Sequence, residues 1–310
     1  MILVAGSANL DFVVRAHHIP APGETVLGQT FTTYPGGKGA NQAVACARAG
    51  NAITQMLLSL GEDSFAAPLR DSLHTADVRL FEAPAQGQPT GCAFICVADN
   101  AENAITVAPG ANLCLLPRHL PELAGFSHLL MQLEIPLPTV TAYAQAAHAQ
   151  GVRVVLNAAP AQQLPAELLE VVDVLIVNEG ELNTLVPYPA SLITNLAQMA
   201  VPSVVVTLGS RGCMARLGNN FFVQPAYAVD ALDTTGAGDT FCGVLTAALA
   251  RGDNITEAMR LASAAGALAC TVEGAQSSIP SARAVAAFLE GRAEPSADAM
   301  EALRSYCGLG

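Results

Sequence analysis

The chain has 310 residues, of which 14 are Lys or Arg and 26 are Asp or Glu, so its formal net charge is −12. So acidic a chain lacks the clustered basic residues that nucleic acids and anionic membranes require, and we expect neither as a partner. Although 52% of the residues are hydrophobic, no run approaches the roughly 20 strongly apolar residues of a spanning helix. The amino terminus shows no targeting pattern, so we expect a soluble, cytoplasmic protein.

Eight cysteines are spread along the chain, and no two form a C-x-x-C pair. In a chain of this length and class, buried free thiols are expected rather than disulfides or a zinc site. The six histidines are scattered, so a metal site built from His and Cys is not predicted.

The first third of the chain predicts a small separate sheet. Residues 1–11 read as a buried strand that ends at Asp11, and 12–35 contain short alternating apolar pieces typical of an antiparallel ribbon. Two similar strands are predicted at 90–98 and 103–108. These four pieces would form a lid beside the main body.

The rest of the chain alternates strands and helices. Near-continuous Val, Ile and Leu strands between amphipathic helices predict a parallel sheet covered on both faces. The predicted strands are 127–132, 152–157, 174–177 and 203–208, followed by a hairpin at 212–225. The predicted helices are 39–49, 139–150, 166–171, 192–199, 239–251, 255–272 and 281–290.

The predicted fold class is therefore α/β, a doubly wound and mostly parallel sheet with a small inserted β-sheet lid. The body would comprise residues 1–11, 37–89 and 109–310, and the lid residues 12–36 and 90–108. In such sheets, ligands bind at the carboxyl ends of the strands.

A run of small residues, Asp233-Thr234-Thr235-Gly236-Ala237-Gly238-Asp239-Thr240-Phe241, leads into the helix predicted from Asp239. Small residues let the backbone approach a ligand closely, and the free N–H groups of a helix start attract anions. A carboxylate there can take the proton of a hydroxyl that attacks a bound phosphoryl group. The alternative is a glycine-rich turn in which Asp239 only caps the helix.

Lys38 is the only lysine of the chain and lies in Gly36-Gly37-Lys38-Gly39-Ala40-Asn41-Gln42-Ala43. The glycines again allow close approach, and Lys38 and Asn41 offer donors to hydroxyl or phosphate groups. The alternative is a hinge between lid and body, with a lysine left over from a bias toward Arg and Ala.

Polar side chains follow several predicted strands. Asn9 and Asp11 end the first strand, Glu134 follows Leu133, and Asn178 and Glu181 follow Val177. Taken singly, each is an ordinary cap or loop residue. Together they indicate a polyol ligand and a hydrated Mg²⁺ at one edge of the sheet.

These motifs, in this order, resemble the ribokinase branch of the PfkB-type carbohydrate kinases over nearly the whole chain. The matching stretches are Gly6–Asp11, Pro20–Thr25 with Gly36–Asn41, Met131–Glu134, Asn178-x-x-Glu181, Thr207–Gly212 and Asp233–Phe241.

The resemblance implies a role for each matching position. Asp239 would be the general base, and Gly236, Ala237 and Gly238 would form the anion hole. The sugar would contact Asn9, Asp11, Gly37, Lys38, Gly39, Asn41, Glu134 and Asp239. ATP would lie against Asn178, Glu181, Thr207, Gly209, Gly212, Gly238 and Ser263, with Glu181 in the Mg²⁺ shell. A monovalent cation, usually K⁺, would be bound by Asp233, Thr235, Ala269, Val272, Gly274 and Ser278. The lid sheets of two subunits would pair, so a homodimer is implied.

The resulting hypothesis is ATP-dependent phosphorylation of the terminal hydroxyl of a pentose, with D-ribose converted to D-ribose 5-phosphate. The same chemistry on deoxyribose, a ketohexose or a nucleoside is the first alternative. A nucleoside would need an aromatic platform on the lid, for which Phe12, Phe31, Tyr34 and Phe94 are the candidates. A non-catalytic sugar sensor is the second alternative, and it predicts a lost base or a broken glycine loop, neither of which the sequence shows.

Overall fold

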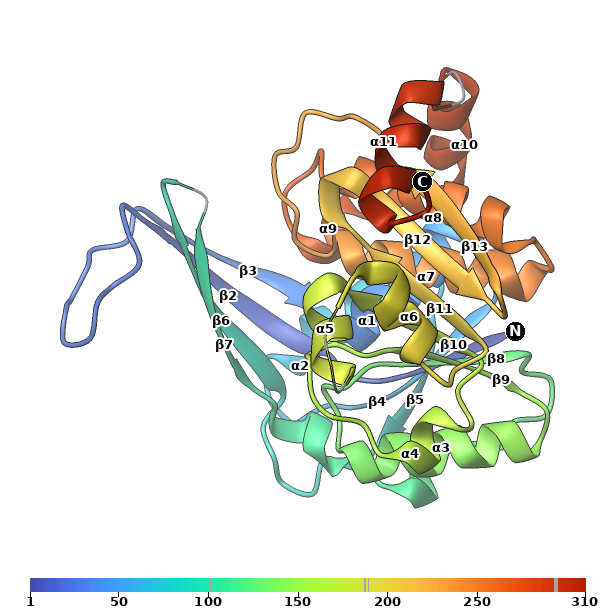
Figure 1. Ribbon diagram of the computed structural model, residues 1–310. Helices are drawn as coiled ribbons and strands as arrows, with labels where there is room; N and C mark the ends of the chain where they lie inside the picture. Colours follow the sequence, from blue (N-terminus) through green and yellow to red (C-terminus); the bar gives the residue numbers. More distant parts are fainter. Residues whose placement is uncertain (101, 187, 189, 293–294) are drawn as a thin grey trace.

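The computed structural model of the protein describes residues 1–100, 102–186, 188, 190–292 and 295–310. They form a large α/β body from which a small β-sheet projects (Figure 1). Within these ranges, every helix is too short or too polar to cross a membrane.

The body is built on one large sheet. Among the described residues it has nine strands, in the order β13-β12-β11-β10-β9-β8-β1-β4-β5. The strands are β1 (Ile2–Ala5), β4 (Thr54–Ser59), β5 (Arg79–Ala83), β8 (His128–Met131), β9 (Arg153–Asn157), β10 (Val174–Asn178), β11 (Ser203–Thr207), β12 (Gly212–Leu217) and β13 (Asn220–Pro225). From β5 to β11 all pairs are parallel, and the β12–β13 hairpin adds an antiparallel edge. The doubly wound, mostly parallel sheet predicted from the sequence is confirmed.

Helices cover both faces of this sheet, which is why its strands are apolar on both sides. One face carries α1 (Lys38–Val44), α2 (Ala66–Thr75), α7 (Ala237–Arg251), α8 (Ile255–Ala269) and α10 (Ala282–Glu290). The other carries α3 (Leu137–Ala149), α4 (Ala166–Leu169), α5 (Glu179–Leu185), α6 (Leu192–Gln198) and α11 (Ala297–Cys307). Val4 packs into the first core and Leu3 into the second, as the period-two alternation of a strand requires.

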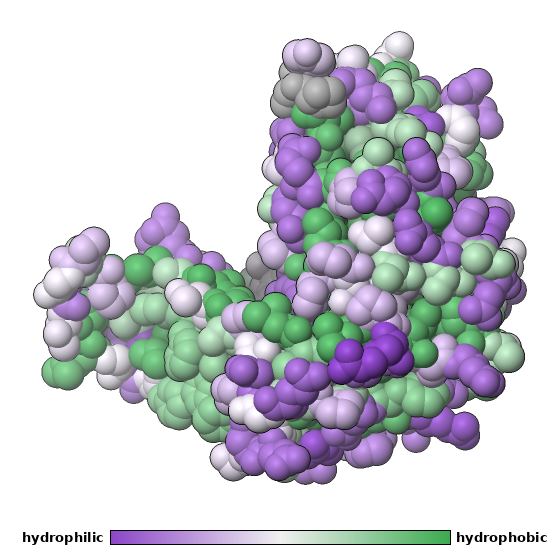
Figure 2. All heavy atoms as spheres, turned by 90° about the horizontal axis from the view of Figure 1, so that it is seen from below, coloured by the Kyte–Doolittle hydropathy of each residue, from purple (hydrophilic) through white to green (hydrophobic). Residues whose placement is uncertain are grey.

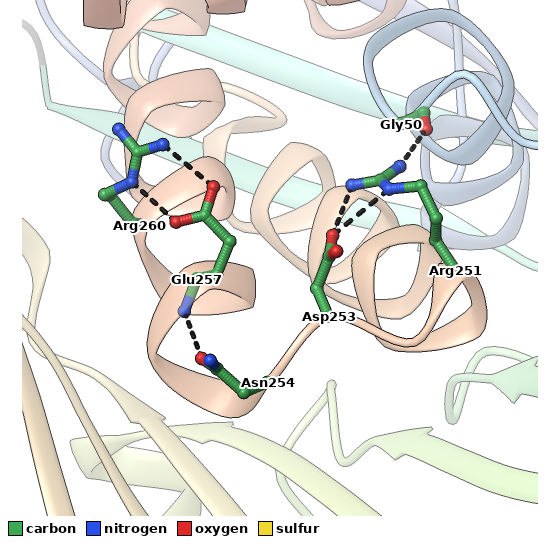
Figure 3. Close-up of polar contacts among 6 residues, drawn as sticks. All are labelled: Gly50, Arg251, Asp253, Asn254, Glu257 and Arg260. Carbon is green, nitrogen blue, oxygen red and sulfur yellow. Dashed lines mark hydrogen bonds and ion pairs between the residues drawn. The ribbon is translucent and has the colours of Figure 1, made fainter.

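The two longest helices of the first face, α7 and α8, are joined by a short turn tied to α1 (Figure 3). Arg251 donates to the carbonyl of Gly50, at the end of the helical segment that starts with α1, at 3.1 Å and to Asp253 at 2.6 Å. Asn254 caps α8 by accepting the N–H of Glu257 at 2.9 Å. The hydrogen bond from Arg251 to Gly50 ties the end of the helix that carries Asp239 to the end of the helical segment that carries Lys38.

The small sheet has the order β3-β2-β6-β7. Its strands are β2 (Asn9–Ala16), β3 (Thr30–Gly36), β6 (Gly91–Ala98) and β7 (Asn103–Ala108). We call this sheet the lid. The central pair β2–β6 is parallel and the outer pairs are antiparallel, so the lid is mixed rather than a purely antiparallel ribbon.

The two faces of the lid differ. Asp11, Arg15 and Tyr34 lie on the face that borders a cleft against the body, which we call the cleft face. Phe12, Phe31 and Phe94 stack on the opposite, outer face, with ring centroids 5.4 and 6.1 Å apart. Figure 2 shows the lid as an arm with a broad hydrophobic surface that continues onto the body.

The strand predicted over residues 1–11 is in fact two strands in two sheets. β1 ends at Ala5, and after Gly6-Ser7-Ala8 the chain enters the lid as β2 at Asn9. The predicted boundary at residue 11 therefore lies inside β2. Several elements were not identified from the sequence, namely β4, α2, β5, α5 and α11. The helix predicted over 255–272 ends at Ala269 and is followed by the short helix α9 (Ala275–Ser278).

Candidate active site

The start of α7 brings an anion-binding backbone next to a buried carboxylate. Gly236 precedes the helix in the left-handed conformation (φ 74°), which favours glycine. The first turn that follows, Ala237-Gly238-Asp239, has N–H groups without i−4 partners inside the helix. The N–H of Ala237 donates to the carbonyl of Thr234 at 3.2 Å. Asp239 is only 8% exposed, and the alternative of a simple cap fails because Gly236 holds the cap position.

Two side-chain amides hold the Asp239 carboxylate. Oδ2 accepts Nδ2 of Asn41 at 2.9 Å, and Oδ1 accepts Nε2 of Gln42 at 3.0 Å. Both donors come from α1, so the two motifs singled out in the sequence meet at one carboxylate. Oδ1 of Asn41 is buried and has no partner among the described residues, so it can accept a hydrogen bond from a ligand.

Lys38 starts α1 and lies among carboxylates. The carboxylate of Asp239, together with those of Glu134 and Glu181, raises the pKa of the Lys38 ammonium in spite of its burial. Glu134 is held in place, since Oε2 accepts the backbone N–H of Lys38 at 3.1 Å and the hydroxyl of Ser7 at 2.5 Å. The N–H of Gly39 donates to the same hydroxyl at 3.3 Å. The side chain of Lys38 thus stays charged and close to Asp239.

Asp11 faces the same space from the lid. Burial, with the nearby carboxylates of Glu134 and Asp239, raises the pKa of Asp11 to about 7. Its carboxyl group is therefore poised to gain from hydroxyl donors, which favour the charged form.

Asn9 and Gly37 complete this side of the site. Asn112 donates to Oδ1 of Asn9 at 2.7 Å, which leaves the Nδ2 donor of Asn9 to face a ligand. Gly37 has φ 88°, and a Cβ there would lie 2.7 Å from the backbone nitrogen of Asn9. The chain therefore requires glycine where α1 passes the start of the lid.

A pocket of about 160 Å³ lies beside Asp239 and is lined by Lys38, Asn157, Asn178, Glu181, Gly238 and Asp239, among others. Asn178 and Glu181 form a reciprocal cap of α5, with Oδ1 and Oε2 each accepting the partner's backbone N–H at 2.8 Å. Burial raises the pKa of Glu181, and the carboxylate of Asp239 adds to this effect. Both residues are therefore helix caps that also border the reaction space.

A larger pocket of about 520 Å³ is lined by Thr207, Gly209, Gly212, Gly238 and Ser263, among others. It adjoins the first pocket, with which it shares lining residues. Thr207 and Gly238 line both pockets. All five are residues that the resemblance assigned to the nucleotide or the anion hole. A ligand in the larger pocket could therefore extend past Gly238 to Asp239.

The residues assigned to a monovalent cation are partly brought together. The carboxylate of Asp233 accepts the N–H of Thr235 and the N–H of Gly274, each at 2.9 Å. Although burial opposes ionisation, these hydrogen bonds hold the pKa of Asp233 below its usual range. Ala269 and Val272 follow at the end of α8, where the N–H of Val272 donates to the carbonyl of Ala269 at 3.3 Å.

Ser278 is buried at the end of α9, and its hydroxyl donates to the carbonyl of Ala275 at 2.9 Å. The set therefore supplies carboxylate, hydroxyl and carbonyl oxygens, the ligand type that hard cations prefer. Nowhere in the described part of the chain do three His, Cys, Asp or Glu side chains gather as a metal site.

Sequence reasoning missed the polar residues that stand behind the site. Gln42, Gln132 and Asn112 are almost fully buried and hydrogen-bond to site residues or to each other. Gln42 could have been found, because it lies in the same glycine-led motif as Lys38 and Asn41. Of the four aromatic candidates for a nucleoside platform, only Tyr34 lines the cleft, because Phe12, Phe31 and Phe94 are on the outer face.

The arrangement can position an anion, a polyol and a base at one point. An anion-binding helix start, a buried carboxylate and a charged lysine meet where the larger pocket joins the hydroxyl-binding side. These groups suit the transfer of a phosphoryl group to a hydroxyl, a reaction that depends mainly on positioning and charge stabilisation.

Comparison with known proteins agrees with this chemistry. Residues 1–282 match the pfkB family of carbohydrate kinases. A ribokinase of Haemophilus influenzae is 38% identical over 302 residues, covering 93% of this chain and 98% of the relative. The crystal structure of a ribokinase from Thermotoga maritima superposes with a TM-score of 0.85 at 33% identity, covering 94% of this chain and 99% of that one. The structure of Arabidopsis thaliana ribokinase complexed with ribose and ATP gives a TM-score of 0.84 at 31% identity, covering 93% and 98%.

Proposed function

The chain belongs to the pfkB family of carbohydrate kinases, and we propose that it transfers the γ-phosphoryl group of ATP to the terminal hydroxyl of ribose, giving ribose 5-phosphate. One observation carries the proposal. Asp239 borders the pocket that opens past Gly238 toward the nucleotide side, and it is hydrogen-bonded to Asn41 on the sugar side. A relative 38% identical over nearly the whole chain is a ribokinase.

In this mechanism Asp239 takes the proton from the terminal hydroxyl as that oxygen attacks the γ-phosphorus, and ADP leaves. Gly236, Ala237 and Gly238 would surround the γ-phosphoryl group at the positive end of α7, with the backbone N–H groups of Gly236 and Gly238 as donors. Lys38 lies next to Asp239 and adds a positive charge where negative charge develops. The ribose hydroxyls would bind Asn9, Asp11, Asn41 and Glu134, with Gly37 and Gly39 lining the approach.

The nucleotide would occupy the larger pocket, bordered by Thr207, Gly209, Gly212 and Ser263. Glu181, with Asn178, would hold hydrated Mg²⁺ against the phosphates. The fit is supported by the carboxylates of Glu181 and Asp239, which border one pocket. Burial and, after it, the nearby Asp239 carboxylate raise the pKa of Glu181, so a cation there would relieve the repulsion between the two carboxylates. Mg²⁺ is commonly bound by one or two carboxylates plus substrate phosphates. When bound, it would neutralise phosphate charge.

A monovalent cation, K⁺ in the first instance, would be held by oxygen atoms of Asp233, Thr235, Ala269, Val272, Gly274 and Ser278. The ionised Asp233, which is held by the N–H groups of Thr235 and Gly274, supports this assignment. Its chemical role would be to fix the loop that leads into Gly236 and thus the anion hole.

We also propose that two chains pair through their lids. The support is the outer face, where Phe31 and Phe94 are 63% and 54% exposed, because adjoining exposed apolar side chains mark interfaces. Sedimentation should give twice the chain mass, and Phe94→Ser should shift it toward the mass of one chain.

The deciding experiment compares the wild type with Asp239→Asn for ADP release in the presence of ribose, ATP, Mg²⁺ and K⁺. We expect kcat to fall by a factor on the order of 10³ while ribose binding, measured by calorimetry, persists. Near-normal turnover in the variant would exclude Asp239 as the base.

Two controls separate the proposal from its alternatives. A sugar panel with 2-deoxyribose, fructose and adenosine tests the acceptor, and faster turnover of any of these than of ribose would replace ribose as the substrate. Ribose binding by the wild type without any ADP release would identify a sugar sensor instead of a kinase.

A further inference from the structure

Two fully buried glutamines stand behind Asp239 on the side away from the anion hole. Gln42 Nε2 donates to Oδ1 of Asp239 and to Oδ1 of Asn157, each at 3.0 Å. Gln132 Nε2 donates to Oε1 of Gln42 at 2.6 Å. Both glutamines are 0% exposed. All three polar positions of the Gln42 amide, its two N–H groups and its carbonyl, are therefore used.

The direction of these hydrogen bonds follows from chemistry. An ionised Asp239 only accepts, so the Gln42 atom that faces it is the nitrogen. Asn157 donates to the carbonyl of Ile176 at 3.1 Å, so its oxygen is the atom turned to Gln42. The Gln42 oxygen then has one donor available, Nε2 of Gln132. The Asp239 carboxylate and the Ile176 carbonyl, at the two ends of this row of hydrogen bonds, can only accept. They therefore fix the orientation of the Gln42 and Asn157 amides between them.

These hydrogen bonds connect the Asp239 carboxylate to the large sheet. Gln132 directly follows β8, Asn157 ends β9, and Ile176 lies in β10, three adjacent strands of the large sheet. Gln42 lies on α1 and Asp239 on α7, two helices packed on that sheet. The orientation of the carboxylate is therefore coupled to the sheet and not only to its own helix.

Stability alone does not account for the pair. Oε1 of Gln132 is buried and has no partner among the described residues, which costs free energy. It also requires glycine at position 6, where a Cβ would clash with it. Apolar side chains of the same size at both positions would avoid this unpaired oxygen, so packing alone does not require the pair.

We propose that Gln42, held in orientation by Gln132, is the positioning residue that aims the Asp239 carboxylate at the attacking hydroxyl. The proposal rests on the function proposed above, in which Asp239 is the base. Gln42 touches Asp239, and Gln132 acts only through Gln42. Neither glutamine is required to contact sugar or ATP.

The test uses the full-length enzyme and the variants Gln42→Met, Gln132→Met and the double variant, since Met keeps length and volume but cannot donate. We expect Gln42→Met to lower kcat by roughly 10 to 100-fold, because a misaimed reacting group loses rate on that scale. The KM for ribose should change less than threefold. Gln132→Met should lower kcat by a smaller factor, and adding it to Gln42→Met should lower kcat no further.

A pH profile separates positioning from mere structure. Donors to an ionised carboxylate favour its charged form, so the acidic limb of kcat should move to higher pH in Gln42→Met. The other titratable groups that face Asp239 are Lys38 of α1, Asp11 of the lid, Glu181 of α5 and Cys242 of α7. All four are present in every variant, so they cannot produce the difference.

Gln55→Met, a buried glutamine of β4 far from the site, is the matched control and should leave kcat and its pH profile unchanged. Folding is checked by thermal unfolding of each variant. Wild-type kcat and pH profile in folded Gln42→Met, or equal and additive losses from both glutamines, would overturn the inference. If instead Asp239→Asn keeps its turnover, the base assignment fails first, so the two failures are distinguishable.

Discussion

Gly36 lies so close to Asp11 that a Cβ on Gly36 would sit 2.1 Å from Oδ2 of the carboxylate. In the register of β2 and β3, Gly36 pairs with Asn9 and Asp11 with Tyr34, so Gly36 and Asp11 are diagonal neighbours near the root of the lid. Gly36→Ala should therefore push the Asp11 carboxylate out of the sugar-binding position. We expect the KM for ribose to rise by roughly 10 to 100-fold, the scale of losses from a displacement near 1 Å, with a smaller effect on kcat.

Gly291→Ala is the matched control for that substitution. A Cβ at Gly291, the residue after α10, would meet its nearest neighbour at 3.7 Å, an ordinary contact. Steady-state kinetics on both variants decide the question. A ribose KM for Gly36→Ala equal to that of the control would mean that Asp11 does not contact the sugar.

Asp11 should make ribose binding depend on pH. Its pKa is raised to about 7 in the free protein, chiefly by burial, and the ribose hydroxyls would donate to its charged form. Binding must then release a proton below pH 7. We expect the Kd for ribose to be about tenfold weaker at pH 6 than at pH 8, as measured by calorimetry in buffers of different ionisation enthalpy.

Asp11→Asn provides the check on that dependence. The amide does not titrate, so both the pH dependence and the proton release should disappear, whatever the absolute affinity. Persistence of the same pH dependence in Asp11→Asn would assign it to another titratable group of the site.

Much of this architecture could be predicted from the sequence because the pattern that encodes it is local. Near-continuous apolar strands between amphipathic helices indicated the covered parallel sheet, and Gly236 to Asp239 indicated an anion site ahead of a helix. The polar strand ends were expected at one edge of the sheet. In the structure, Lys38, Glu134 and Glu181 do lie close enough for their charges to interact.

The rest depends on contacts between distant parts of the chain. The strand predicted over 1–11 divides because Asn9 pairs with Gly36 and Gly91, partners that no local pattern identifies. Gln42 follows Asn41 on a helix, and its burial appears only once α7 is packed against α1. The last helix, α11, buries only Leu303 and Cys307, so its sequence carried too weak an apolar stripe to be recognised.

An ion pair connects the lid to the loop proposed to bind a monovalent cation. Nη2 of Arg15 in β2 lies 3.1 Å from Oε1 of Glu273, and both side chains are about half exposed. Exposed pairs contribute about 1 kcal/mol or less, so Arg15→Glu should raise the KM for ribose only about two- to fivefold. The exchange Arg15→Glu with Glu273→Arg should restore it. A double variant no better than the single one would show that the pair does not hold the lid.

His128 and Asp11 should change the free energy of unfolding in opposite directions as the pH falls. Burial, with the nearby Arg153, lowers the pKa of His128 to about 4. The contribution of the neutral His128 to the free energy of unfolding is therefore complete above pH 6.5 and is lost as the pH falls from 6.5 to 4. The raised pKa of Asp11 has the opposite sign, because its contribution is complete below pH 4 and is lost as the pH rises to 7.

Removing one of the two residues should therefore reveal how the free energy of unfolding depends on pH through the other. Urea unfolding of His128→Leu should show a free energy of unfolding that rises on acidification from pH 7 to 5, whereas Asp11→Asn should show one that falls more steeply than in the wild type. The slopes should add in the double variant, because His128 starts β8 at the far end of the sheet from the lid-side Asp11 and the two share no partner. A His128→Leu profile parallel to that of the wild type would mean that this histidine is not buried in its neutral form.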